Sequence, residues 1–152
     1  MDKILVATDF SPHSEAALDL ALSLVRGEGA TLTLLHVCQV PTYAYFGGGV
    51  YVPSPELIET ILSDAKRALT TICERVAKRG VRVDGHAVVG DPATDIVRWA
   101  HEHGCDLIVV GTHGRRGFRR FMLGSVAERV VRTAEMPVLT AHLTPKAEEA
   151  RP

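Results

Sequence analysis

Glycines at fixed spacing, between an apolar run and an amphipathic stretch, are the most informative feature of the sequence. Gly111 and Gly114 follow the apolar run 105–110, and Gly124 and Ser125 precede a stretch whose apolar residues recur at helical spacing. The pattern predicts a strand, a glycine-bearing loop and a helix N-terminus in succession. Free backbone N–H groups and the helix dipole converge at such a place and favour an anion. We therefore interpret this segment as a phosphate-binding loop.

Four arginines lie between these glycines, at positions 115, 116, 119 and 120. They could form a solvated face above the apolar residues beside them, and we expect only one or two to reach a ligand. The glycines could likewise be turn residues that need positive φ. Three glycines at a strand end and a helix start, with four cations among them, favour the anion site over a plain turn.

Three side chains near this loop have competing interpretations. Ser125 and Glu128 fit the spacing of a capping box, which alone would explain both residues. A capped helix still offers N–H groups to a phosphate, so the two interpretations are compatible. His113 is a tempting catalytic residue, but a lone loop histidine without a positioned partner is more often exposed or structural. We favour that structural interpretation.

Asp9 ends the first apolar run and has two possible roles. Its carboxylate could help to cap the helix that follows, or it could meet a ribose hydroxyl, a base edge or a metal-bound water. The chain contains no P-loop lysine motif, no dinucleotide fingerprint after the first strand, and no nucleophile-elbow or zincin motif. Nothing in it pairs a nucleophile with a base, so we predict no catalytic residue and no direct metal ligand.

Five apolar runs alternate with four stretches of helical periodicity. The expected strands are 3–8, 31–38, 81–89, 105–110 and 137–141. Three expected helices begin at the cap pairs Ser11-Pro12, Ser54-Pro55 and Asp91-Pro92. The first ends near Gly27 and Gly29, the second at Gly80 and the third at Gly104, and a fourth helix runs over about 125–135.

This alternation predicts an α/β fold, a doubly wound parallel sheet with helices on both faces. The pattern leaves open the strand orders 3-2-1-4-5 and 2-1-3-4-5, although Arg82 and Asp84 place the third strand nearer an edge. If the first and fourth strands are neighbours, the loops that start at Asp9 and Gly111 flank one crevice at the carboxyl ends of the strands.

The segment 39–53 differs from the rest of the chain. It holds all three tyrosines beside a run of three glycines, and such a long connection in a compact domain is usually functional or disordered. We expect an insertion packed on the protein's own surface or at a subunit contact, with a flap over a ligand as the alternative. Residues 143–152 form a polar tail that we expect to be frayed.

Composition narrows the class of protein. The 152 residues suit one domain, and 46% hydrophobic with 23% charged residues is typical of a soluble globular protein. A net charge of -1 argues against a general binder of nucleic acid or anionic membranes. We expect the three scattered cysteines to be small buried hydrophobic residues of a protein in a reducing compartment. Because a strand pattern starts by Ile4, we expect no signal peptide. We expect a cytoplasmic protein.

Several short motifs of this chain resemble those of one family. They are residues 5–11 (LVATDFS), 35–37 (LHV) and 89–92 (VGDP), and above all the spacing Gly111-x2-Gly114-x9-Gly124-Ser125. Together they are similar to a universal stress protein of the ATP-binding class, and the resemblance extends over residues 1–142 as a single domain. It implies an adenine nucleotide alpha hydrolase-like fold with strand order 3-2-1-4-5, and a homodimer joined through the last strand, Val138 to Ala141.

The resemblance also implies ATP with a divalent metal, Mg or Mn, and a set of site residues. Thr8, Asp9 and Val37 would line the adenine and ribose; Gly111, Thr112, Gly114 and Arg115 would wrap the ribose and phosphates; Gly124, Ser125 and Val126 would hold the phosphate tail. Asp9 could reach the metal through water. Ala127 stands where some ATP-binding members have a hydroxyl residue, and the richness in arginine could favour another polyphosphate or a nucleotide signal.

Three functions remain open from the sequence. We expect a nucleotide-binding stress or signalling protein whose glycine loop is ordered by ATP. The enzyme alternative is a slow ATPase or phosphotransferase that uses Asp9 and Mg, although the P-loop lysine and a clear base are missing. The third is a nucleotide-free dimeric interaction module in which the glycines are only turns.

Overall fold

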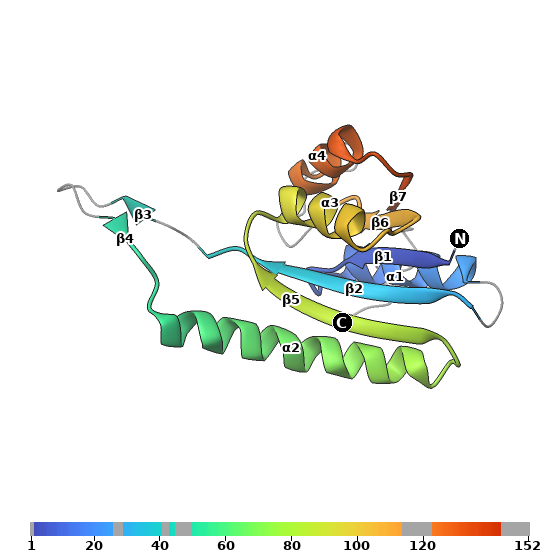
Figure 1. Cartoon of the computed structure of the whole chain (residues 1–152), viewed down its shortest axis with the longest axis horizontal. Coiled ribbons are helices and arrows are strands. Elements are labelled where there is room, and N and C mark those ends of the chain that lie inside the picture. Colours follow the sequence, from blue (N-terminus) through green and yellow to red (C-terminus); the bar gives the residue numbers. More distant parts are fainter. Residues whose placement is uncertain (1, 26–28, 41–42, 45–49, 114–122, 144–152) are drawn as a thin grey trace.

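A computed structural model describes residues 2–25, 29–40, 43–44, 50–113 and 123–143 of the chain. Its main element is a five-stranded parallel sheet with the spatial order β5-β2-β1-β6-β7 (Figure 1). The strands are β1 (Lys3–Ala7), β2 (Thr31–Cys38), β5 (Arg82–Val89), β6 (Leu107–Gly111) and β7 (Val138–Ala141). In chain order of these five strands this is 3-2-1-4-5, so the fold expected from the resemblance is confirmed and β5 lies at an edge as predicted.

In the described part of the chain, four helices cover the sheet in two layers: α1 (Pro12–Leu24), α2 (Pro55–Ala77), α3 (Pro92–Glu102) and α4 (Ser125–Thr133). α1 and α2 pack on one face, against residues such as Val6, Leu34 and Val109. α3 and α4 pack on the other face, against Leu5 and Ile108 among others. Because side chains alternate along a strand, central strands that are covered on both faces must be apolar throughout. This explains the unbroken apolar runs of β1 and β6.

Local signals in the sequence fix where three of the helices begin. Ser11, Ser54 and Asp91 are the N-caps of α1, α2 and α3, and each side chain accepts a hydrogen bond from the backbone N–H three residues later. A proline follows each cap, where its fixed φ suits the first turn and no N–H is needed. After α2 and α3, Gly80 and Gly104 adopt positive φ, which ends both helices as predicted.

The connection 39–53 contains regular structure that the sequence reading did not assign. Two short strands, β3 (Tyr43–Ala44) and β4 (Val50–Tyr51), pair antiparallel as a hairpin. Aromatic and β-branched residues on either side of a glycine run favour this arrangement. Figure 1 shows the hairpin beyond the carboxyl ends of the sheet strands, near the start of α2. Among the described residues, no helix combines the length and the apolar character needed to cross a membrane.

Candidate functional site

The crevice expected from the sequence would lie at the carboxyl ends of β1 and β6, which run side by side. Their register pairs Ile4 with Leu107 and Val6 with Val109, so both strands end at the same edge of the sheet. The chain leaves β1 toward α1 on one face and leaves β6 toward α4 on the other. Such a switch in direction opens the crevice in which doubly wound sheets bind ligands. The residues after both strands are therefore the candidate site.

The turn between β1 and α1 is held by its own side chains. Asp9 Oδ1 accepts a hydrogen bond from the Ser11 N–H at 3.0 Å, and Thr8 Oγ1 accepts one from the Phe10 N–H at 3.1 Å. Phe10 has φ of 64°, a left-handed conformation that is strained for a residue with a side chain. Strain of this kind persists only where surrounding contacts fix it. The turn that presents Asp9 is therefore preorganised.

The imidazole of His36 on β2 contacts and stabilises this turn, a role that was not predicted from the sequence. Its Nδ1 lies 2.7 Å from the carbonyl oxygen of Thr8, and its ring lies against the Phe10 ring with centroids 4.5 Å apart. A carbonyl can only accept a hydrogen bond, so Nδ1 carries the proton. The available signal was an imidazole in the apolar second half of β2, between Leu35 and Val37.

Thr112 is completely buried, and all of its hydrogen-bonding groups are used. Its N–H donates to the Ala141 carbonyl at 2.9 Å, and its carbonyl accepts from the Gly124 N–H at 2.6 Å. Its hydroxyl contacts Nδ1 of both His113 and His142, each at 3.2 Å. Thr112 thus joins the end of β6 to β7 and to the start of α4. A direct contact between Thr112 and a nucleotide remains a prediction, and it would compete with these bonds.

Two glycines of the motif allow close approach of backbone. A Cβ built on Gly111 would lie 2.7 Å from the backbone carbon and oxygen of His13 in the first turn of α1. A Cβ on Gly124 would lie 3.0 Å from the carbonyl oxygen of Thr112. A side chain at position 111 would push β6 away from the first turn of α1, and one at position 124 would press on the backbone of Thr112 and His113. Packing therefore requires glycine at position 111, and the fit at Gly124 is tight.

The start of α4 differs from the expected capping box. Its N-cap is Gly124, and no side chain caps it. Ser125 is the first helical residue and is exposed, while Glu128 contacts Arg132 at 3.3 Å instead of reaching back. The capping-box interpretation was wrong because Gly124, not Ser125, is the N-cap: its carbonyl accepts the first hydrogen bond of the helix, from the Glu128 N–H at 2.9 Å. Without a side-chain cap, the first N–H groups of this helix are suited to an anion.

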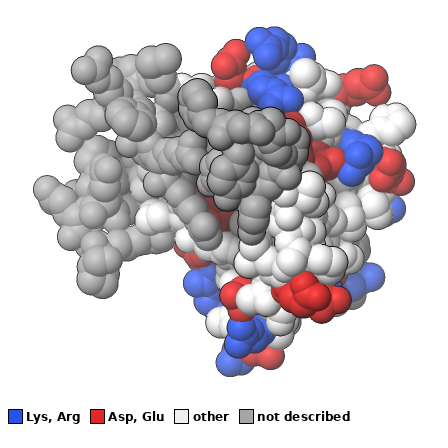
Figure 2. Space-filling view, turned by 90° about the vertical axis from the view of Figure 1, so that its left-hand side faces the viewer, with Lys and Arg blue, Asp and Glu red and all other residues white. Residues whose placement is uncertain are grey.

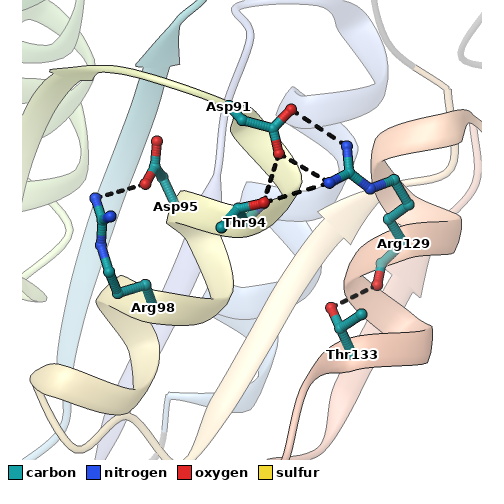
Figure 3. Close-up of polar contacts among 6 residues, drawn as sticks. All are labelled: Asp91, Thr94, Asp95, Arg98, Arg129 and Thr133. Atoms are coloured by element: carbon teal, nitrogen blue, oxygen red, sulfur yellow. Dashed lines mark hydrogen bonds and ion pairs between the residues drawn. The ribbon is translucent and has the colours of Figure 1, made fainter.

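Arg129 fixes the position of α4 against α3. Its guanidinium contacts both carboxylate oxygens of Asp91, at 3.2 and 3.0 Å, and also Thr94 Oγ1 at 3.3 Å (Figure 3). Hydrogen bonds from the Thr94 hydroxyl, from Arg129 and from the Thr94 N–H lower the pKa of Asp91 from 3.8 to about 2. Asp91 is therefore ionised at neutral pH, and the paired charges join the N-cap of α3 to the second turn of α4.

The other predicted site residues differ in their exposure to solvent. Val37 is almost buried, at 8% exposed, among the residues beneath α3 and α4, whereas Val126 is 36% exposed on α4. Gly114, Arg115 and the remaining three arginines lie outside the described residues. Figure 2 faces the end of the molecule where the sheet strands terminate, and on its described surface acidic and basic side chains are interspersed. The basic character of the loop therefore remains a prediction from the sequence.

Protein ligands for a metal are sparse in the described residues. Among them there is no group of three or more His, Cys, Asp or Glu side chains that could hold a metal ion. Asp9 Oδ1 accepts the Ser11 N–H, and a contact of Asp9 with a metal through water remains a prediction. Mg²⁺ is often bound by substrate phosphates and water with one or two carboxylates.

Comparison with known proteins identifies the family. The model of the universal stress protein family matches residues 1–142. The chain belongs to this family. The universal stress protein YxiE of Bacillus subtilis is 37% identical over 143 residues, which cover 91% of this chain and 97% of the relative. The family resemblance read from the sequence is thus confirmed.

Solved structures in the family share the fold. The protein MJ0577 superposes with a TM-score of 0.79 at 28% identity, covering 94% of this chain and 96% of that chain. A universal stress protein in complex with cAMP superposes with a TM-score of 0.70 at 25% identity, covering 94% of this chain and 98% of the other. The same fold therefore holds an adenine nucleotide in at least one relative.

Proposed function

We propose that this universal stress protein binds an adenine nucleotide, ATP with Mg or Mn, in the crevice between the loops after β1 and β6. The observation that carries the proposal is the start of α4. It lies at the switch point of the sheet, has no side-chain cap, and is anchored to Thr112 by the Gly124 N–H. A relative of the same fold in complex with cAMP supports the choice of an adenine nucleotide.

The proposed contacts are arranged from the β1 side of the crevice to the start of α4. Residues on the β1 side and on β2 would contact the base and ribose, and the residues at the start of α4 would contact the phosphates. They are Thr8, Asp9 and Val37 for the adenosine, Gly111, Thr112, Gly114 and Arg115 for the ribose and first phosphates, and Gly124, Ser125 and Val126 for the phosphate tail. The metal would sit on the phosphate oxygens and water, with Asp9 as an outer-sphere partner. Nucleotide occupancy would then be the signal that this stress-response protein reports.

Thermal unfolding with and without MgATP tests this proposal. A ligand that binds only the folded state stabilises it by RT ln(1 + [L]/Kd), about 2.7 kcal/mol at a hundredfold excess over Kd. For a chain of this length that corresponds to a rise in Tm of roughly 5 to 11 °C. The protein must first be freed of co-purified nucleotide, which mass spectrometry of the denatured protein detects. An unchanged Tm at millimolar MgATP contradicts the proposal.

We also propose that two copies associate through β7. This strand lies at the end of the sheet, and the carbonyls of Pro137 and Ala141 point toward β6. Because backbone groups alternate sides along a strand, the N–H groups of Val138 and Thr140 point outward, where a second β7 could pair with them. Thr140→Pro removes one outward donor and leaves the bonds to β6 in place. Light scattering should show a dimer for the wild type and a monomer for this variant; a dimeric variant would exclude β7 pairing.

A further inference from the structure

One buried histidine nitrogen beside the proposed nucleotide site has no hydrogen-bond partner in the part of the chain that the structure describes, and the role proposed for it rests on that site. Among the described residues, the His113 Nε2 is the buried side-chain nitrogen or oxygen for which no hydrogen-bond partner is found. A buried polar atom without a partner is costly, so native proteins rarely keep one without a reason. His113 belongs to the loop whose backbone we propose to bind phosphate. An atom that gains its partner when the ligand arrives would account for the cost.

The surroundings of His113 lie at the crevice. Its ring packs against the ring of His13, in the first turn of α1, with centroids 5.3 Å apart. Its Cα would be 3.5 Å from a Cβ on Gly124, which is the N-cap of α4. The side chain therefore lies between the two helix starts that flank the proposed phosphate position.

The hydrogen bonds of Thr112 restrict which nitrogen of His113 carries a proton. The Thr112 hydroxyl lies between Nδ1 of His142 and Nδ1 of His113. A hydroxyl has one hydrogen, so between two neutral imidazoles it donates to one Nδ1 and accepts from the other. The two hydrogen bonds can therefore point in either of two directions. When His142 donates to Thr112 and Thr112 donates to His113, the His113 Nδ1 is an acceptor, and the proton of this ring is on Nε2.

A phosphate selects between these two directions. Its ionised oxygens only accept hydrogen bonds, and charge-assisted bonds to them are the strong ones. We propose that His113 is a phosphate-binding side chain of this protein, that its Nε2–H donates to a phosphate oxygen of the nucleotide, and that Thr112 and His142 are its positioning residues. Binding of phosphate would then fix the hydrogen-bond direction as far as His142, the residue after β7.

Two variants distinguish the roles of the two imidazole nitrogens of His113. The amide of His113→Asn falls near the Nδ1 position and keeps the bond to Thr112, whereas the amide of His113→Gln falls near the Nε2 position. Titration calorimetry with MgATP should show about tenfold or more weaker binding for the Asn variant, as for other lost bonds to charged groups, and binding within about threefold of wild type for the Gln variant. His101→Asn, at an exposed histidine whose side chain is 71% accessible on α3, is the matched control.

Adenosine provides the second arm of the experiment. Because the proposed contact is to a phosphate, the Asn variant should bind adenosine as the wild type does. Equal losses for ATP and adenosine would mean a structural role and would overturn the proposal, as would ATP binding equal to that of the wild type. If both variants lose ATP binding, ¹⁵N NMR of the wild-type imidazole decides: an Nε2 proton that shifts with ATP supports the proposal, and an unchanged signal refutes it. If the wild type binds no nucleotide, the proposed function itself is refuted; this result is distinguishable from a loss of binding that is confined to the variants.

Discussion

Gly111→Ala tests the packing on which the candidate site depends. The added Cβ would lie 2.7 Å from the backbone carbon and oxygen of His13 and 3.0 Å from its Cβ. Carbon atoms in contact prefer about 3.5 to 4.0 Å, so β6 and the first turn of α1 must separate by about 0.8 Å or more. The obstacle is mainly backbone, which cannot rotate away as a flexible side chain could.

The cost follows from overpacking. Inserting a group into a well-packed site typically costs about 1 to 3 kcal/mol, and for a chain of this length each kcal/mol lowers Tm by about 2 to 4 °C. We therefore expect Gly111→Ala to lower Tm by roughly 2 to 12 °C. Because α1 would move together with the turn that carries Asp9, we also expect weaker binding of MgATP.

Gly29→Ala is the matched control for this experiment. Gly29 is exposed, its φ is not positive, and a Cβ there meets nothing within 4 Å. Restricting the unfolded chain should leave its stability unchanged or slightly higher. Differential scanning calorimetry compares the three proteins. A Tm of Gly111→Ala within about 1 °C of the wild type, or an equal loss in Gly29→Ala, would refute the argument that backbone contact at Gly111 is tight.

Two further predictions concern the start of α4 and the charge pair behind it. Gly124→Val should weaken binding of MgATP while leaving the far-ultraviolet circular dichroism spectrum unchanged, because the Cβ would lie 3.0 Å from the Thr112 carbonyl oxygen and would displace the start of α4 from the end of β6; normal binding would mean that the phosphates lie elsewhere. Asp91→Asn keeps the N-cap of α3 but removes the charge that Arg129 and Thr94 stabilise. Because folding lowers the Asp91 pKa from 3.8 to about 2, this stabilisation is present above about pH 4 and is lost as the pH falls toward 2. Urea midpoints should therefore separate wild type from variant at pH 6 and converge near pH 2; a constant difference would contradict the assignment.

The sequence alone determined the features that depend on neighbouring residues. The cap pairs that open α1, α2 and α3 act over three residues, and positive-φ glycines end α2 and α3 at the next turn. The apolar runs specified buried strands because each covered face needs its own apolar residues. These signals lie within a short window of sequence, so they could be read before the fold was known.

The tertiary structure decided what depends on residues far apart in the chain. Periodicity left two strand orders open, and only the pairing of β1 with both β2 and β6 settles them. The capping box at Ser125 is absent because α4 begins with Gly124 as its N-cap, and the Gly124 N–H bonds to Thr112, twelve residues earlier in the chain. The contacts of Thr112 with His142 and of Arg129 with Asp91 join residues 30 and 38 positions apart. Such pairs meet only when the strands and helices pack together, and that packing is what brings the two sides of the crevice into position.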